Sequence, residues 1–581
     1  MTVSQELKTA PKTELLHPTQ DDFAEFDGET RRLLKATVDW FEERGKTRLL
    51  KDYVDKVFYQ DFLDFAAREK LFATFLTPAA DGAGNADKRW DTARVAKLSE
   101  ILGFYGLNYW YPWQVTVLGL GPVWQSTNTD PRKRAADLLD GGAVAAFGLS
   151  EQAHGADIYS TDLVLTPVEG GGYKASGSKY YIGNGNCARI VSVFGRVQGR
   201  DGLDQYVFFL ADSEHPNYTV IKNVVPSQMY VAEFELNDYP VSEDDILHVG
   251  ADAFSAALNT VNIGKFNLCF GGIGLSTHAL YESVTHAHNR ILYGSPVTKF
   301  DHVRREFVDA YARLMGMKLF SERAVDYFRT ASPEDRRYLL FNPVTKMKAT
   351  TEAEKVLALL GDVMSAKAFE AETYTTAARI DVAGLPKLEG TVAVNLALIL
   401  KFMPAYLHHS QDLPVPGVQL EARDDEFLFN QGPASGLGKV QFHDWRKPFA
   451  ENAGIPNVAA FTERAEALAT LVAAEKDAIK TAGLDLQLSI GELFTLVVYG
   501  GLILEQAKLR GADEQLIDQI FEILNRDFSQ YAVDLIGKRE ATATQRQWAK
   551  NVISEPVFNS ERFDAIWNRV EALSGVYEMR A

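Results

Sequence analysis

A single carboxylate, Glu389, stands in a setting that suits proton transfer. In the stretch LPKLEGTVAVN, residues 385–395, it follows a turn that contains Pro386 and precedes Gly390 and an apolar segment. Apolar neighbours remove water from a carboxylate, which disfavours its charged form and raises its pKa. Such a group could take a proton from a substrate as a general base. The alternative is that Glu389 only complements the dipole of the first turn of the following helix, and the stretch alone favours that alternative.

Two glycine-containing segments further upstream could hold an anion or the edge of a planar ring. They read FGLSEQAHGADIYSTDLVLTP at residues 147–167 and GYKASGSKYYIGNGNCARIVSVFGRV at residues 172–197. Backbone N–H groups in turns of this kind form concave binding sites. Two ordinary hairpin turns would give the same pattern, so both interpretations stay open here.

Other motifs carry less chemistry. GPASGLGKV has Pro433 at the first glycine position of a phosphate loop and Val440 at the position of its magnesium-binding hydroxyl, so it does not predict a nucleotide triphosphatase. FGGIGLST lacks the third glycine of a dinucleotide fingerprint. His286 and His288, two residues apart on a predicted helix, do not have a convincing metal spacing. We therefore predict no metal site.

Composition restricts the class of protein. The 581 residues are 46% hydrophobic and 24% charged, which is typical of a globular protein with more than one domain. A net charge of -18 without a basic run argues against nucleic acid and anionic membranes as partners. The two cysteines are too few for a disulfide framework, and with no apolar leader at the N-terminus they favour the cytoplasm.

The elements that must position the candidate residues fall into four regions, which together predict an α+β fold. Helical spacing of apolar residues predicts an N-terminal helical domain, short β-rich runs predict a small barrel or sandwich, and long helical patterns predict a bundle. The apolar run at residues 493–504 is too short to span a bilayer and predicts a buried helix in an appended helical region. The boundaries are 1–142, 143–250, 251–410 and 411–581.

Four motifs in this order resemble those of the acyl-CoA dehydrogenase family, across roughly residues 30 to 405. Its LTEPxAGSD pattern stands here as LSEQAHGAD at 149–157, and GxKxWITNG as GSKYYIGNG at 177–185. Its ERxxFG region stands as NRILYG at 289–294, and its YEGT motif as LEGT at 388–391. Each motif is weak alone, but the ordered set is specific.

The resemblance implies that FAD is the cofactor and that Glu389 is the catalytic base. Arg290 would meet the pyrophosphate of a neighbouring subunit's FAD, because a guanidinium fork suits phosphate oxygens. The residues implied to bind the cofactor are Phe147, Leu149, Ser150, Gly155, Ala156, Tyr181, Gly183, Arg290, Leu292, Tyr293, Ser365, Ala366, Lys367, Thr391 and Asn395. Those implied to bind substrate are Ala156, Lys265, Leu388 and Gly390.

Several positions depart from the family's pattern. Gly183 replaces a threonine whose hydroxyl reaches the flavin in relatives, Leu388 replaces a tyrosine, and Ala366 replaces a glycine of the FAD-binding turn. Lys265 stands where relatives carry an arginine. Gly264 occupies the position that carries the base in some relatives, which leaves Glu389 as the matching carboxylate.

The expected activity is FAD-dependent α,β-dehydrogenation of an acyl-CoA to a trans-2-enoyl-CoA, which belongs to fatty acid metabolism. The resemblance further implies an electron-transferring flavoprotein or another electron acceptor as partner, and a homodimer or higher homo-oligomer. The appended region resembles that of very-long-chain members. Two alternatives remain: an acyl-CoA oxidase on the same fold, or a non-catalytic partner subunit that kept the fold and lost the chemistry.

Overall fold

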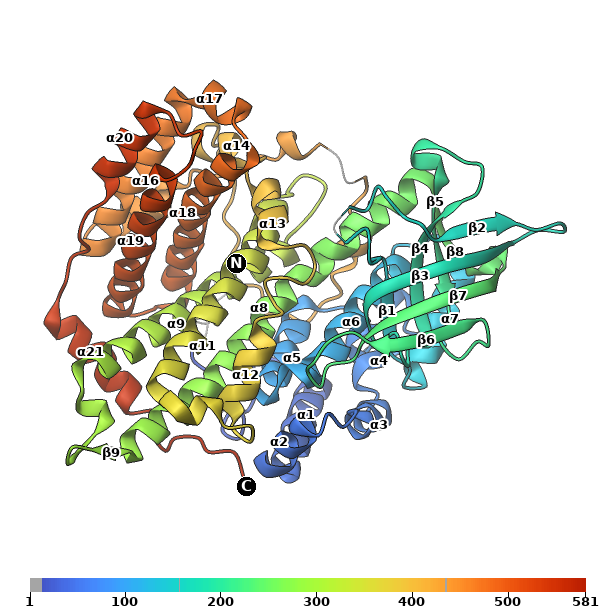
Figure 1. The fold of residues 1–581 in the computed structure, drawn as a ribbon, viewed down its shortest axis with the longest axis horizontal. Coiled ribbons are helices and arrows are strands. Elements are labelled where there is room, and N and C mark those ends of the chain that lie inside the picture. The colour runs from blue at the N-terminus through green and yellow to red at the C-terminus, as the bar shows by residue number, and fades with distance from the viewer. Residues whose placement is uncertain (1–12, 156, 434–435) are drawn as a thin grey trace, which may run out of the picture.

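The computed structural model describes residues 13–155, 157–433 and 436–581 (Figure 1). Its first region is helical, as predicted. The helices are α1 (Gly28–Arg44), α2 (Lys46–Val54), α3 (Gln60–Arg68), α4 (Leu71–Leu76), α5 (Thr92–Tyr105), α6 (Leu107–Trp124) and α7 (Thr129–Asp140). Every residue of α6 is buried. The helix carries aromatic and aliphatic side chains on all of its sides, so no side of it favours contact with water. Helix α6 is therefore a central element, in contact with the sheet on one side and the bundle on the other.

The second region forms one hydrogen-bonded mixed sheet. Its strands are β1 (Ala145–Gly148), β2 (Val164–Pro167), β3 (Tyr173–Gly183), β4 (Ile190–Val197), β5 (Tyr206–Ala211), β6 (Tyr218–Asn223), β7 (Val231–Val241) and β8 (Ile246–Val249). The order is β6-β7-β3-β2-β4-β5-β8, and β1 pairs with β4. Strands β1 and β2 both run parallel to β4, whereas the other pairs are antiparallel. Strand β5 also contacts β7, although three strands separate them in this order, so the sheet curves into the small β domain that was predicted.

The third region is the predicted bundle. It contains α8 (Gly250–Asn289), the hairpin β9 (Ile291–Leu292) and β10 (Ser295–Pro296), α9 (Asp301–Arg329), α10 (Tyr338–Val344), a π-helical turn (Thr345–Ala349), α11 (Thr350–Met364), α12 (Tyr374–Val382), α13 (Val392–Ile399) and α14 (Met403–His408). Helix α8 crosses the middle of the molecule and contacts α5, α6, α9 and α11.

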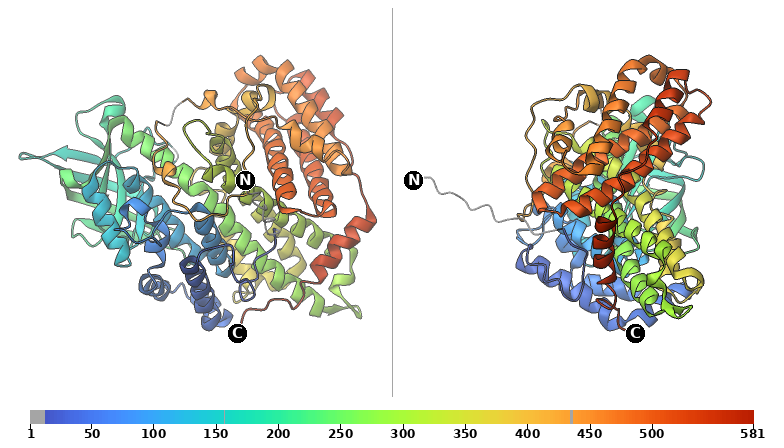
Figure 2. Two further views of the ribbon diagram at one scale, coloured as in Figure 1. Left: turned by 180° about the vertical axis from the view of Figure 1, so that it is seen from behind. Right: turned by 90° about the vertical axis from the view of Figure 1, so that its left-hand side faces the viewer.

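The appended region is also helical. It contains α15 (Arg446–Glu451), α16 (Pro456–Ala474), α17 (Lys476–Thr481), α18 (Leu484–Arg510), α19 (Glu514–Ile536), α20 (Ala543–Val552) and α21 (Ser560–Glu571). Helices α18, α19 and α21 pack on α9 of the same chain (Figure 2). Helix α18 is long and apolar enough to cross a membrane by length and composition, but 83% of its most apolar window is buried inside the protein. It contains the run 493–504, which was predicted to be a buried helix.

Candidate active site

Glu389 lies in the loop between α12 and α13, outside any helix. Its φ is +51° and that of Gly390 is +85°, so both residues are in the left-handed region. Thr391 is the N-cap of α13 and accepts a hydrogen bond from the backbone N–H of Val394. Glu389 therefore precedes the cap by two residues and does not stand in the first turn of the helix. The left-handed backbone of a non-glycine residue is a strained conformation that is enriched at functional sites.

The Glu389 side chain points into the protein. Gln114 Nε2, on α6, donates to Glu389 Oε1 at 2.5 Å. Glu389 Oε2 is inaccessible to solvent and has no hydrogen-bond partner in the described part of the chain. Burial raises the pKa of Glu389 to about 7, although the Gln114 hydrogen bond and the ammonium groups of Lys346 and Lys265 act to lower it. The carboxyl group is thus placed near the middle of its titration at neutral pH.

The two lysines come from elements that pack against the Glu389 loop. Lys346 lies on the π-helical turn between α10 and α11, and its Nζ donates to the backbone oxygen of Pro386 at 2.5 Å. Lys265 lies on α8 and is 5% exposed. Burial lowers the pKa of Lys346 to about 7 and that of Lys265 to about 8, and Glu389 opposes the shift in both. Single π-helical turns recur at functional sites, and this one anchors the loop that carries Glu389.

One face of α6 connects the Glu389 loop to the end of β3. Tyr111, Gln114, Val115 and Leu118 have i, i+3, i+4 and i+7 spacing, which places them on the same side of the helix. A β-carbon at Gly264 on α8 would lie 2.5 Å from Leu118 Cδ2 and 2.8 Å from Glu389 Oε2. These contacts place the carboxyl group between α6 and α8, where any larger residue at position 264 would displace it.

The other edge of this face meets Gly183 at the end of β3. A β-carbon at Gly183 would lie 2.5 Å from Val115 Cγ2 and 2.7 Å from Tyr111 Cε1. The sequence has glycine at this position because α6 already fills the space that a side chain would need. The tip of β3 and Glu389 are therefore joined by a single wall of α6 side chains.

The loop at residues 149–151 is tied to β3. The backbone N–H of Tyr180 donates to Ser150 O at 3.0 Å, and the fully buried Lys179 donates through Nζ to Leu149 O at 3.0 Å and to Glu151 Oε1 at 2.7 Å. The two glycine-containing motifs thus meet in space. Tyr181 lies at the exposed edge of the region where the two motifs meet. It is 57% exposed and its φ is +64°.

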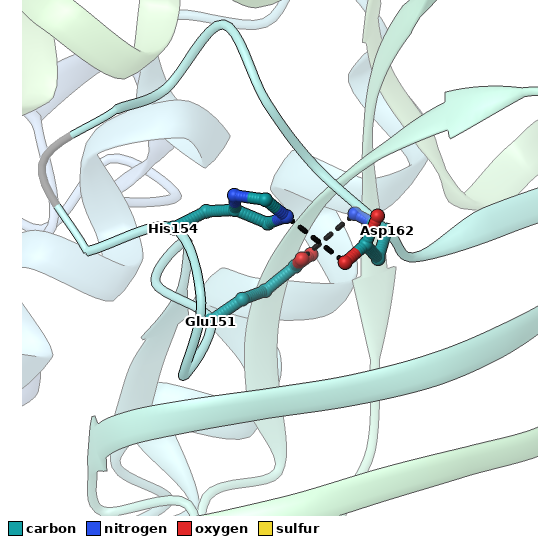
Figure 3. A group of neighbouring side chains, drawn as sticks. All are labelled: Glu151, His154 and Asp162. Carbon is teal, nitrogen blue, oxygen red and sulfur yellow. Dashed lines mark hydrogen bonds and ion pairs between the residues drawn. The ribbon is translucent and has the colours of Figure 1, made fainter.

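Glu151, His154 and Asp162 form a group whose spacing could suit a metal ion (Figure 3). His154 Nε2 lies 2.9 Å from Asp162 Oδ2, while Glu151 accepts hydrogen bonds from Thr161 Oγ1 and from the backbone N–H of Asp162. The Lys179 ammonium already neutralises Glu151 at 2.7 Å. The buried Lys179 ammonium would repel a metal ion bound at Glu151. We therefore interpret the contact between Lys179 and Glu151 as an ion pair that shapes the loop at 149–151.

Comparisons with known proteins agree with this arrangement. Residues 253–403 match the family model "Acyl-CoA dehydrogenase, C-terminal domain". The short-chain specific acyl-CoA dehydrogenase of Megasphaera elsdenii is 24% identical over 288 residues, which cover 47% of this chain and 72% of that protein. The structure of an acyl-CoA dehydrogenase complexed with FAD from Bacillus anthracis aligns with a TM-score of 0.74 at 16% identity and covers 96% of both chains.

The chain has the acyl-CoA dehydrogenase fold. The predicted resemblance and fold class are confirmed, and because the Bacillus anthracis structure covers nearly the whole chain, the appended helices belong to this version of the fold. An active-site mutant of nitroalkane oxidase also aligns, with a TM-score of 0.57, 16% identity, and coverage of 65% of this chain and 96% of that one. The fold therefore also occurs in a protein named as an oxidase.

Within the acyl-CoA dehydrogenase fold, the predicted cofactor residues separate into groups. Phe147, Leu149, Ser150, Gly155, Tyr181 and Gly183 belong to the sheet region. Arg290, Leu292, Tyr293, Ser365, Ala366 and Lys367 lie on or beside the β9 hairpin and the 3-10 turn Ser365–Phe369, at the end of the bundle far from the sheet (Figure 1). One chain therefore does not bring the two groups together. Tyr293 is 98% exposed and Phe369 in that turn is 86% exposed.

The remaining predictions concern the Glu389 loop and its surroundings. Thr391 is exposed, whereas Asn395 is buried and donates to the backbone oxygens of Gly390 and Thr391. Leu388 and Gly390 flank Glu389, and Lys265 interacts with it. Ala156 lies outside the described residues.

Sequence reasoning did not identify Tyr111, Gln114 or Lys346. The signal available was a glutamine inside YWYPWQVTVLGLG, an otherwise apolar helix, since a buried amide needs a specific partner. The identity of that partner could not be read from the sequence.

Proposed function

We propose that this protein is an FAD-dependent oxidoreductase that dehydrogenates acyl-CoA thioesters to trans-2-enoyl-CoA. The observation that carries the proposal is the Glu389 carboxyl group, whose Oε2 is buried without a partner among the described residues and whose pKa burial raises to about 7. A general base works best when its pKa lies near the operating pH. Glu389 meets that condition and has one oxygen free for a proton.

The loop also offers a donor for the substrate carbonyl. Within the described chain, the backbone N–H of Glu389 has no acceptor, and its left-handed conformation separates it from the capping bonds of α13. Donating to the thioester oxygen, it would stabilise the negative charge that develops when the α-carbon loses its proton. Glu389 would take that proton, and Lys265 and Lys346 would favour the charged carboxylate before the transfer.

The residues at the tip of β3 fit a flavin. An exposed aromatic ring at Tyr181 stands beside the partly exposed Leu149 and Ser150, and exposed apolar surface of this kind marks ligand sites. These residues would hold the ring system beside the face of α6 whose other edge contacts Glu389. The chemistry that FAD supplies when bound is acceptance of a hydride from the β-carbon.

The second group of predicted cofactor residues supports a homo-oligomer. Arg290 and the turn Ser365–Phe369 lie far from the sheet of their own chain (Figure 1), so we propose that they contact the FAD of a neighbouring copy. An electron-transferring flavoprotein or another acceptor would reoxidise the cofactor. A cytoplasmic location is also proposed, and the two unpaired cysteines, Cys187 and Cys269, support a reducing compartment.

Two alternative functions predict different experimental results. An acyl-CoA oxidase, which the similarity to nitroalkane oxidase favours at the level of fold, would pass its electrons to oxygen. A non-catalytic partner subunit would not be reduced by any acyl-CoA.

Anaerobic titration of the purified flavoprotein with acyl-CoAs of graded chain length tests the proposal. We expect at least one acyl-CoA to bleach the flavin absorbance. Stoichiometric oxygen uptake during steady-state turnover would identify the oxidase instead. Purification without flavin, or a flavin spectrum that no acyl-CoA changes, would contradict the proposed function.

A further inference from the structure

Gln114 is a buried amide that joins three elements at Glu389. It lies on α6, donates through Nε2 to Glu389 Oε1 at 2.5 Å, and donates to the backbone oxygen of Gly264 on α8 at 3.1 Å. Its residue is 1% exposed. Because both of its amide hydrogens have acceptors on other elements, the orientation of its side chain is determined by the packing of α6 against α8.

The other charged and titratable groups around Glu389 do not fix the direction of the carboxyl group. Tyr111 faces it from α6, Lys265 from α8 and Lys346 from the π-helical turn. Lys346 Nζ donates to Pro386 O instead. Among the described residues, Gln114 is the one side chain that donates a hydrogen bond to the carboxyl group.

We propose that Gln114 is a positioning residue that holds Glu389 by one oxygen and leaves the other oxygen to accept the proton. The inference rests on the proposed function of Glu389 as the base. The two oxygens of the carboxyl group have different surroundings. The Gln114 amide donates to Oε1. Oε2 faces Gly264, where no β-carbon occupies the space, and has no hydrogen-bond partner in the described structure. A carboxylate held by a single donor keeps its orientation and its capacity to be protonated.

Replacement of the amide should change the ionisation of Glu389. Gln114→Leu keeps a side chain of similar length but cannot donate to the charged carboxylate, so the pKa of Glu389 should rise. Hydrogen bonds to charged groups are worth enough to move the midpoint upward by about 1 pH unit or more. Gln114→Met, which is unbranched like glutamine and also cannot donate, should move it in the same direction.

The control is Gln125, the C-cap residue of the same helix. Gln125 also bridges α6 and α8, through donation to Thr260 Oγ1 at 3.0 Å, and no contact joins it to Glu389. Gln125→Leu therefore removes a comparable interhelical amide and should leave the ionisation of Glu389 unchanged.

The measurement is an infrared pH titration of the purified flavoprotein without acyl-CoA. The carboxyl band of Glu389 is identified as the band that is lost in Glu389→Gln. We expect its midpoint to move upward in Gln114→Leu and Gln114→Met and to stay in place in Gln125→Leu. If Gln114→Leu does not fold, Gln114→Met alone decides.

An unchanged midpoint in the folded Gln114 variants, or an equal shift in Gln125→Leu, would overturn the inference. Because the titration uses no substrate, this result is independent of whether any acyl-CoA bleaches the flavin. A shifted band together with an unreactive flavin would reject the proposed dehydrogenation and leave the contact between Gln114 and Glu389 established.

Discussion

Glu352 and Glu389 are both buried carboxylates of the helical bundle, but their surroundings differ. Glu352, on α11, lies 2.6 Å from Arg313 Nη1, 2.7 Å from Lys348 Nζ and 3.0 Å from Lys355 Nζ. Although burial alone would raise the pKa of Glu352, these cations hold it well below its ordinary value. Arg313 also pairs with Asp527 on α19 at 2.8 Å, so this cluster fastens the appended helices to the bundle.

Glu389 receives one hydrogen bond from a neutral amide and faces its two lysines without a direct hydrogen bond from either. For this residue burial outweighs the attraction of the cations, and the pKa rises to about 7. The comparison shows that burial does not by itself determine whether the pKa of a carboxylate is raised or lowered. The number of charged donors in direct contact determines whether the group can take up a proton at neutral pH.

The largest expected effect separates the two carboxylates by chemistry. Glu389→Gln keeps the shape of the side chain but cannot accept the α-proton, so flavin bleaching by acyl-CoA should slow by about 100-fold to 10,000-fold. Rapid-mixing absorbance measurements would determine the rate, with flavin content as the check on folding. Near-normal bleaching by this variant would remove Glu389 from the mechanism.

Glu352→Gln should act on stability instead. Removal of this charge leaves Arg313, Lys348 and Lys355 facing one another with Asp527 as their remaining anion, which should cost about 3 kcal/mol of unfolding free energy. The matched control is Glu354→Gln, which breaks only the partly exposed 3.2 Å pair with Lys387 and should cost less than about 1 kcal/mol. Chemical denaturation would measure both, and similar losses in the two variants would contradict the comparison.

The pH dependence of stability should have opposite signs at the two sites. The pKa of Glu389 is raised from 4.5 to about 7 in the folded protein. Between these two pH values the folded protein holds a proton that the unfolded chain releases. The free energy of unfolding therefore falls as the pH rises through this window. Glu389→Gln should therefore be more stable than wild type by about 1–3 kcal/mol above the window and equal to it below. The stability that Glu352 contributes through its lowered pKa is instead present above its ordinary pKa and lost as pH falls. Urea unfolding at a series of pH values would measure both contributions to the free energy of unfolding. Contributions from Glu389 and Glu352 that change with pH in the same direction would contradict the prediction.

The smallest effect concerns the lysine that anchors the Glu389 loop. Lys346→Met removes the donor to Pro386 O and a charge that lowers the pKa of Glu389. The pH midpoint of flavin bleaching should rise by about 1 unit or less. Lys387→Met, which changes an exposed lysine of the same loop, is the control. A midpoint that does not move in Lys346→Met would show that this lysine only packs.

Sequence patterns were sufficient where the information is local. The short β-rich runs of residues 143–250 predicted the strands of that region, among them β4 and β5, because β-branched and aromatic side chains favour strands. Glu389 could be proposed from its motif, since Gly390 and Thr391 mark the left-handed turn and the cap that follow it. The order of the strands could not be predicted in this way, because it depends on pairings between distant segments.

The partners of Glu389 could not have been predicted in the same way. Gln114 is 275 residues away from Glu389 and 150 residues away from Gly264 along the chain, and no spacing rule relates positions on different helices. The reason for glycine at 183 is equally non-local, since it lies in the Tyr111 and Val115 side chains of α6. The residue types along this chain are enough to define its regions and to nominate one carboxylate, because helix, strand and turn preferences act over a few residues. Packing of α6, α8 and the π-helical turn around that carboxylate decided its partners and its pKa, because desolvation and hydrogen bonding depend on which side chains meet in the folded protein.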